Sequence, residues 1–116
     1  MAKKTKVEIW HNPRCSKSRQ TLALLEEQGI EPTIVRYLDE PPTKSRIKAV
    51  AKLLGGPEKL VRTKEAAFEE RGLEGATKTA LIDAMAEEPK LIERPVVITA
   101  KGARIGRPPE SVLEVL

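Results

Sequence analysis

The chain has 116 residues, of which 40% are hydrophobic, 3% aromatic and 33% charged, and its formal net charge is +4. This length favours a single domain spanning residues 1–116, with an aliphatic core and a well-solvated surface. The single Trp, Tyr and Phe provide no aromatic array for stacking bases, and the basic residues form no continuous stripe, so nucleic-acid binding is not expected.

The first third of the chain predicts a strand, a helix and a second strand. Residues 6–10 form a short apolar run typical of a buried strand. Residues 16–28 predict a helix with three leucines on its apolar face, and Gly29 follows as its C-terminal stop. Residues 33–37 predict a second strand. Two strands joined by a helical crossover form a right-handed parallel βαβ unit.

A helical block with almost no strand signal is expected at about residues 43–88, after the break at Pro41-Pro42. Thr43 and Thr77 each stand where a helix N-cap is favoured, and Gly55-Gly56 would end the first helix. The helical stretches expected in the block are 44–54, one or two short helices over 58–71, and 78–87.

The last part of the chain predicts two strands, at 96–99 and 103–106, joined by a tight turn that ends at Gly102. Pro108-Pro109 then opens a final helix whose apolar positions are Val112, Leu113, Val115 and Leu116. The order β-α-β, helical block, β-β-α predicts an α/β fold with one mixed sheet of about four strands.

The expected location is the cytoplasm. The basic residues 1–6 lead into no apolar segment, so no signal peptide is expected, and no apolar run approaches the ~20 residues of a membrane span. A single cysteine forms no internal disulfide, which favours a reducing compartment.

Cys15 is the most informative residue, because it follows the first predicted strand and opens the first predicted helix. At that position a thiol meets unpaired backbone N–H groups and the positive end of the helix dipole, which favour the thiolate. Arg14, Lys17 and Arg19 add positive charge nearby. The same geometry suits an anion. A nucleophile is favoured over the alternative, a buried structural thiol.

The residues around Cys15 also limit its chemistry. Ser18 stands where a CxxC motif would have its second cysteine, so the chain has no dithiol of its own and needs an external thiol for exchange. One His and one Cys do not complete a zinc shell, so no metal is expected.

The chain resembles the arsenate reductase family of the glutaredoxin-dependent type. The resemblance extends from Val7 to Val115, and its most specific parts are an HNPxCSKSR motif, a later RPxxxT motif and a GRP motif. These motifs stand in the chain as His11-Asn12-Pro13-Arg14-Cys15-Ser16-Lys17-Ser18-Arg19, Arg94-Pro95-Val96-Val97-Ile98-Thr99 and Gly106-Arg107-Pro108, and Glu93 precedes the second of them.

This resemblance implies a thioredoxin-like fold, βαβ plus ββα, with a helical insertion between the halves and Pro95 in the cis form. It implies that Cys15 attacks arsenate while Arg62, Arg94 and Arg107 hold the oxyanion, as planar guanidinium groups can do for anionic oxygens. The alternative for each arginine is an ordinary solvated surface position.

Four further residues are candidates for binding the oxyanion or stabilising the thiolate. His11 either lowers the pKa of Cys15 or orders the loop as a hydrogen-bonded turn residue. Ser18, one helical turn after Cys15, either donates a hydrogen bond to the sulfur or satisfies the backbone. Asn12, Ser16 and the amides after Cys15 complete the expected anion cradle.

The resemblance implies that no cofactor is bound, that glutathione is a co-substrate and that glutaredoxin is a protein partner. Two other interpretations stay open at this point. One is a family member with glutathione-linked thiol activity and little arsenate turnover. The other is a regulatory protein of the same fold that binds RNA polymerase, a branch that typically carries the CxxC pair absent here.

Overall fold

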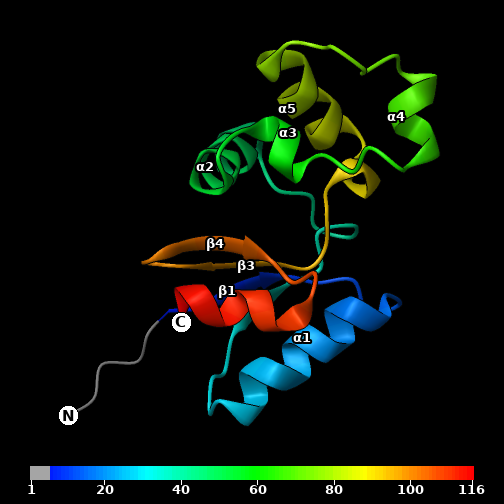
Figure 1. Ribbon diagram of the computed structural model, residues 1–116. Coiled ribbons are helices and arrows are strands. Elements are labelled where there is room, and N and C mark those ends of the chain that lie inside the picture. The colour runs from blue at the N-terminus through cyan, green and yellow to red at the C-terminus, as the bar shows by residue number, and fades with distance from the viewer. Residues whose placement is uncertain (1–5) are drawn as a thin grey trace. The chain divides into compact units, whose positions relative to one another are not determined.

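The computed structural model describes residues 6–116, so the basic start of the chain lies outside the described residues except for Lys6. The described chain divides into two compact units, which we call the sheet unit and the helical unit (Figure 1). The sheet unit comprises the residues up to Tyr37 together with Arg94–Leu116, and the helical unit is Leu38–Glu93. The insertion expected at 43–88 falls within the helical unit.

Four strands form one mixed sheet in the order β2-β1-β3-β4. Strand β1 pairs parallel with β2 and antiparallel with β3, and β3 pairs antiparallel with β4. This sheet confirms the predicted α/β, thioredoxin-like class, although three of the strands are shorter than expected or shifted by one residue. Their bounds are Glu8–Trp10 for β1, Thr33–Val35 for β2, Val96–Thr99 for β3 and Gly102–Ile105 for β4.

Two helices, α1 (Ser16–Glu27) and the 3₁₀ helix η2 (Pro109–Val115), lie on the same side of the sheet in Figure 1. They bury an aliphatic cluster between them and the strands, as expected, although Trp10 and Tyr37 of the same unit are also fully buried. The members of this cluster are Val7, Ile9, Leu25, Val97, Val112 and Val115. Val7 and Ile9 are two apart, so they point to one face of the sheet, in keeping with the alternation of a strand.

The final helix is the clearest departure from the predicted elements, because it is a 3₁₀ helix rather than an α-helix. Its buried residues are Pro109, Val112 and Val115, which recur every three positions. A 3₁₀ helix places residues three apart on a single edge, so this spacing buries all three together. Leu113, expected on the apolar face, is instead 42% exposed.

Helix α1 also buries a face that its leucines do not reveal. Its fully buried residues are Ser18, Thr21 and Leu25, so two of the three are polar. Thr21 donates to the carbonyl of Lys17 at 2.8 Å, and Ser18 is bonded within the site described below. Each buried hydroxyl therefore has a partner, as burial requires.

The helical unit contains the elements α2 (Lys44–Leu54), α3 (Pro57–Leu60), α4 (Ala66–Glu70), α5 (Lys78–Glu87) and the 3₁₀ turn η1 (Pro89–Leu91). The predicted caps are confirmed: Thr43 accepts from the N–H of Arg46 at 3.2 Å, and Thr77 from that of Ala80 at 3.1 Å. Gly55 ends α2 in the left-handed region, with φ +103°.

Most of the large buried side chains of this unit are apolar and lie on α2, α3, α5 and η1. They include Ile47, Val50, Leu60, Leu81, Met85 and Leu91. None of the helices among residues 6–116 is long and apolar enough to span a membrane.

Candidate active site

Cys15 lies at the N-cap of α1, as the sequence predicted. A turn from Asn12 to Cys15 brings the chain from β1 into α1, and the N–H of Cys15 donates to the carbonyl of Asn12 at 3.0 Å. Cys15 has extended backbone angles, φ −92° and ψ 123°, and its side chain is part-buried. The sulfur therefore lies beside the first N–H groups of the helix while remaining reachable from solvent.

The pKa of Cys15 is lowered from its ordinary value by a balance of opposing effects. Partial burial of the thiol raises the pKa, but the backbone N–H groups of Ser18 and Lys17 and the charges of Arg94 and Arg107 together outweigh it. The helix end therefore acts on the sulfur through its first backbone N–H groups. The thiolate character of Cys15 rests on these groups and on two arginines that are distant from it in the sequence.

The guanidinium of Arg107 faces the sulfur. Its Nη2 atom lies 3.8 Å from Cys15 Sγ, although 92 residues separate the two in the chain. Its Nε donates to the backbone carbonyl of Arg94 at 3.0 Å, which fixes the plane of the group. One edge of Arg107 is thus fixed to the main chain, and the other edge is directed to the thiol.

Arg94 contributes the second cation. Its Nε and Nη1 atoms are buried and have no hydrogen-bond partner among residues 6–116. Buried N–H groups without acceptors are unusual and costly, so this side chain has the donors that an anionic ligand would use. The peptide bond between Arg94 and Pro95 is cis, as the resemblance implied, and so is the bond between Arg107 and Pro108.

His11 and Ser18 form a buried hydrogen-bonded pair beneath the Cys15 turn. Nδ1 of His11 lies 2.6 Å from Oγ of Ser18, and this oxygen also accepts the N–H of Asn12 at 3.0 Å. No bond joins the Ser18 hydroxyl to the Cys15 sulfur within the described residues. We therefore assign the Ser18 hydroxyl as the donor of the hydrogen bond to His11 Nδ1. Ser18 therefore affects the thiol through its backbone N–H rather than through its hydroxyl.

This arrangement favours a neutral His11 that orders the loop. Burial first, and then the charges of Arg36 and Arg19, lower the pKa of His11. A neutral imidazole with its proton on Nε2 fits the bond to Ser18. Of the two roles considered for His11, the geometry supports the ordering of the loop.

The remaining candidates of the cradle are also placed by local bonds. Oδ1 of Asn12 accepts the N–H of Arg14 at 3.0 Å, so the side chain holds the turn instead of facing the sulfur. Ser16 is the exposed first residue of α1. Arg19, which the sequence suggested as a local charge on Cys15, instead donates to the carbonyl of Pro13 at 2.9 Å. Arg19 thus orders the loop, while Arg94 and Arg107 supply the charge near the sulfur.

Gly106, the glycine of the GRP motif, is a positioning residue that was not among the candidate site residues. Its N–H donates to the carbonyl of Pro95 at 2.9 Å, which ties the segment of Arg107 to the segment of Arg94. A Cβ on Gly106 would overlap the Thr21 hydroxyl and would lie 2.8 Å from Pro95 Cγ. Only glycine fits where these three segments meet. The sequence carried no signal for this contact, because the burial of Thr21 on α1 is seen only in the folded chain.

Arg62 lies in the other unit and is engaged there. Its guanidinium pairs with Glu65 at 2.8 Å, and its backbone N–H donates to the carbonyl of Leu91 at 2.6 Å. The structure therefore gathers Cys15, Arg94 and Arg107 in the sheet unit and places Arg62 in the helical unit.

The gathered groups suit nucleophilic attack on an oxyanion. A thiolate-prone sulfur lies beside two guanidinium groups that can offset the charge of an anionic reactant. Within residues 6–116 no three His, Cys, Asp or Glu side chains are close enough together to hold a metal ion.

Comparison with known proteins gives a consistent result. The model of the ArsC family matches residues 10–115. An uncharacterized protein of Escherichia coli (strain K12), YfgD, is 48% identical over 114 residues, covering 95% of this chain and 96% of that protein. An arsenate reductase of Haemophilus influenzae is 45% identical over 95% of this chain and 98% of its own length. The solved arsenate reductase of Vibrio cholerae superposes with a TM-score of 0.94 at 47% identity, covering 98% of this chain and all of that one.

Proposed function

The chain belongs to the ArsC family, and from this premise we propose that it is an arsenate reductase with Cys15 as its nucleophile. The observation that carries the proposal is the contact between Arg107 Nη2 and Cys15 Sγ, 3.8 Å, beside the unpartnered guanidinium nitrogens of Arg94. A thiolate and a ready pair of anion-binding groups are what attack on arsenate needs.

In the first step the Cys15 thiolate attacks the arsenic of arsenate. A sulfur–arsenic bond forms, and one arsenate oxygen, after protonation, leaves as water. The lowered pKa of Cys15 increases the thiolate fraction at neutral pH. Arg107 and Arg94 offset the repulsion between the thiolate and the incoming anion, and they hold arsenate oxygens through charge-assisted hydrogen bonds.

The two electrons come from outside the chain, because Cys15 is its only cysteine. The glutathione thiolate attacks the sulfur of the Cys15 adduct and forms a mixed disulfide. The electron pair of the sulfur–arsenic bond passes to arsenic, which leaves as arsenite. A thiolate of glutaredoxin then attacks the glutathione sulfur of the mixed disulfide, which forms a glutaredoxin–glutathione disulfide and releases the Cys15 thiolate. This exchange requires the reducing conditions of the cytoplasm.

Arg62 is the third arginine of the proposed oxyanion site, and its test is separate. The Glu65 carboxylate already partners it. If Arg62 contributes to the reaction, Arg62→Ala reduces arsenate turnover more than Glu65→Gln does, since both variants lose the ion pair.

The decisive experiment is arsenate-dependent oxidation of NADPH, coupled through glutathione reductase, glutathione and glutaredoxin. We expect turnover with the unmodified chain and none with Cys15→Ser, whose hydroxyl is a far weaker nucleophile. Reactions without arsenate or without glutaredoxin are the controls. Folded protein with a reactive Cys15 but no arsenate-dependent turnover would overturn the proposal in favour of a thiol-linked or regulatory role.

A further inference from the structure

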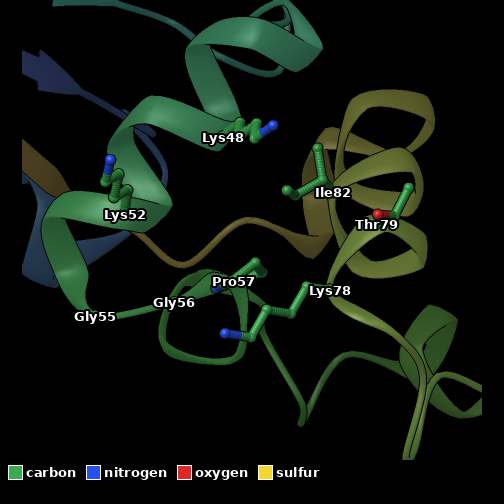
Figure 2. Close-up of a pocket in the computed structure, with 8 residues that line it drawn as sticks. All are labelled: Lys48, Lys52, Gly55, Gly56, Pro57, Lys78, Thr79 and Ile82. Atoms are coloured by element: carbon green, nitrogen blue, oxygen red, sulfur yellow. The ribbon is translucent and has the colours of Figure 1, made fainter.

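A cavity of about 360 Å³ in the helical unit lies against α2 and the start of α5 (Figure 2). Three of its lining residues are the lysines Lys48, Lys52 and Lys78. Figure 2 shows Lys48 extending from α2 towards α5, and Lys78 extending from the start of α5 towards the Gly56-Pro57 turn. We call this hollow the lysine cavity. Its volume falls within the range of small-ligand pockets.

The charge of α2 is unusual for a solvated helix. The helix carries four basic residues and no acidic one. Lys44, Lys48 and Lys52 are spaced by four, so neighbouring ammonium groups on one face repel each other. Lys44 pairs with Asp83 of α5 at 3.2 Å. Lys48 and Lys52 have no ion-pair partner among residues 6–116.

The start of α5 adds to this positive region. Thr77 caps the helix by accepting the N–H of Ala80 at 3.1 Å, but the N–H groups of Lys78 and Thr79 have no acceptor within the helix. The first turn of this ten-residue helix holds no acidic residue and begins with Lys78, although the dipole there favours a negative charge. A bound anion would accept from the free N–H groups and would supply the negative charge that the first turn lacks.

The other lining residues are uncharged. Ile82 and Pro57 line the cavity with the lysine stems, and the hydroxyl of Thr79 is available beside them. A second hollow of about 230 Å³ shares Lys48, Thr79 and Ile82 and extends to the Lys44–Asp83 pair. The Glu58 carboxylate lies beside Gly56 but is not part of the lining.

We propose that the lysine cavity binds a small phosphorylated molecule. Its phosphate lies between Lys48, Lys78 and the first N–H groups of α5, and its uncharged part packs on Ile82 and Pro57. Phosphate is favoured over carboxylate because the lining has no arginine fork, whereas lysine ammonium groups and helix N-termini both suit phosphate. The proposal does not rest on the chemistry of Cys15.

The test is a titration of the full chain with pyrophosphate and with adenosine 5′-monophosphate at constant ionic strength, followed by ¹⁵N–¹H NMR and calorimetry. We expect saturable shifts at residues 48–57 and 77–83, and tighter binding of the monophosphate per charge because its uncharged part is also buried. Lys48→Gln and Lys78→Gln should each weaken binding at least about tenfold.

The matched control is Lys64→Gln, which removes the same charge from an exposed position of the helical unit outside the cavity. Its affinity should equal that of the unmodified chain. Thr79→Glu, which places a negative charge in the cavity, should abolish binding with the NMR spectrum still that of a folded chain. All four variants should retain arsenate turnover. A failure of this proposal can therefore be distinguished from a failure of the proposed function.

Three results would overturn the proposal. Shifts confined to residues 11–18, 94 and 107 would mean that phosphate binds only beside Cys15. An equal loss of affinity in Lys64→Gln would mean that net charge alone attracts the anion. Much tighter binding of a single-stranded oligonucleotide, with the same dependence on Lys48 and Lys78, would identify a nucleic-acid surface instead.

Discussion

The two cationic regions of this chain use different side chains and organise them differently. In the sheet unit, Arg107 is held by a main-chain carbonyl and directed at a sulfur. In the helical unit, the ammonium groups of Lys48 and Lys78 stand on flexible stems with no partner among the described residues. Fixed guanidinium groups beside a nucleophile suit a reaction, whereas mobile ammonium groups without a nucleophile suit binding only.

The two regions also differ in how deeply their polar side chains are buried. Around Cys15, the polar side chains of His11 and Ser18 are buried and bonded to each other. Around the lysine cavity, the polar groups are on exposed helix faces. Substitutions in the first region should therefore affect both turnover and folding, and substitutions in the second should affect ligand binding alone.

Arg107→Ala is expected to give the largest difference between an effect on arsenate turnover and an effect on binding at the lysine cavity. Loss of a positioned anion-binding group should lower kcat/KM for arsenate about a hundredfold, while pyrophosphate binding at the lysine cavity stays the same. Arg104→Ala is the matched control, because Arg104 lies on β4 and pairs with Glu114 instead. Arsenate turnover unchanged in Arg107→Ala would remove this arginine from the site.

Gly106→Ala should damage the sheet unit itself. The new methyl group meets Thr21 and Pro95, so we expect a loss of about 1–3 kcal/mol in the free energy of unfolding, measured with urea. Adding Thr21→Ala should recover part of that loss, because it removes one of the two clashes. A Gly106→Ala chain as stable as the original would show that the three segments are not closely packed there.

The pH dependence of Cys15 alkylation tests whether Arg107, and not the lysine cavity, acts on the pKa of Cys15. Because the pKa of Cys15 is lowered in the folded chain, the midpoint of the rate should fall below the ordinary thiol value of about 8.5. Arg107→Ala should raise this midpoint and Lys48→Gln should leave it in place. The same shift means that the thiolate stabilises the fold fully above about pH 8.5, and that this contribution is lost as pH falls through the lowered pKa.

The smallest effect is expected from His11. Its pKa is lowered in the folded chain, so the unfolded chain takes up this proton at a higher pH. Stability should therefore fall as pH drops from about 6.5 through the lowered pKa. His11→Gln removes this titration, and urea unfolding at pH 7.0 and 5.5 should show a smaller difference between the two pH values. Equal differences in both chains would place the acid sensitivity elsewhere.

Much of the fold could be predicted because its signals are local. Thr43, Thr77 and Gly55 mark helix ends through bonds and backbone angles that depend on neighbouring residues only, and α2 and α5 begin and end where expected. The 3₁₀ form of η2 was missed because the apolar positions 112, 113, 115 and 116 fit the spacing of an α-helix, whereas the residues that the structure buries are 109, 112 and 115.

The candidate site was less accessible to local reasoning. The position of Cys15 at a helix start follows from its neighbours, but Arg107 reaches the sulfur from 92 residues away. Only the family resemblance singled out that arginine. The roles of Ser18 and Thr21 were obscured because buried hydroxyls in a helix leave no hydrophobic pattern, and their partners are seen only in the folded chain.

The bond from Arg107 Nε to the carbonyl of Arg94 makes the two arginines unequal. The acceptor is a main-chain atom, which every amino acid at position 94 retains. A chain that lost the Arg94 side chain would still hold Arg107 in its present orientation. A chain that lost Arg107 would leave that carbonyl without this donor. Loss of the Arg94 side chain would thus remove its own charge and donors from the site, while the orientation of the arginine that faces the thiol would be kept.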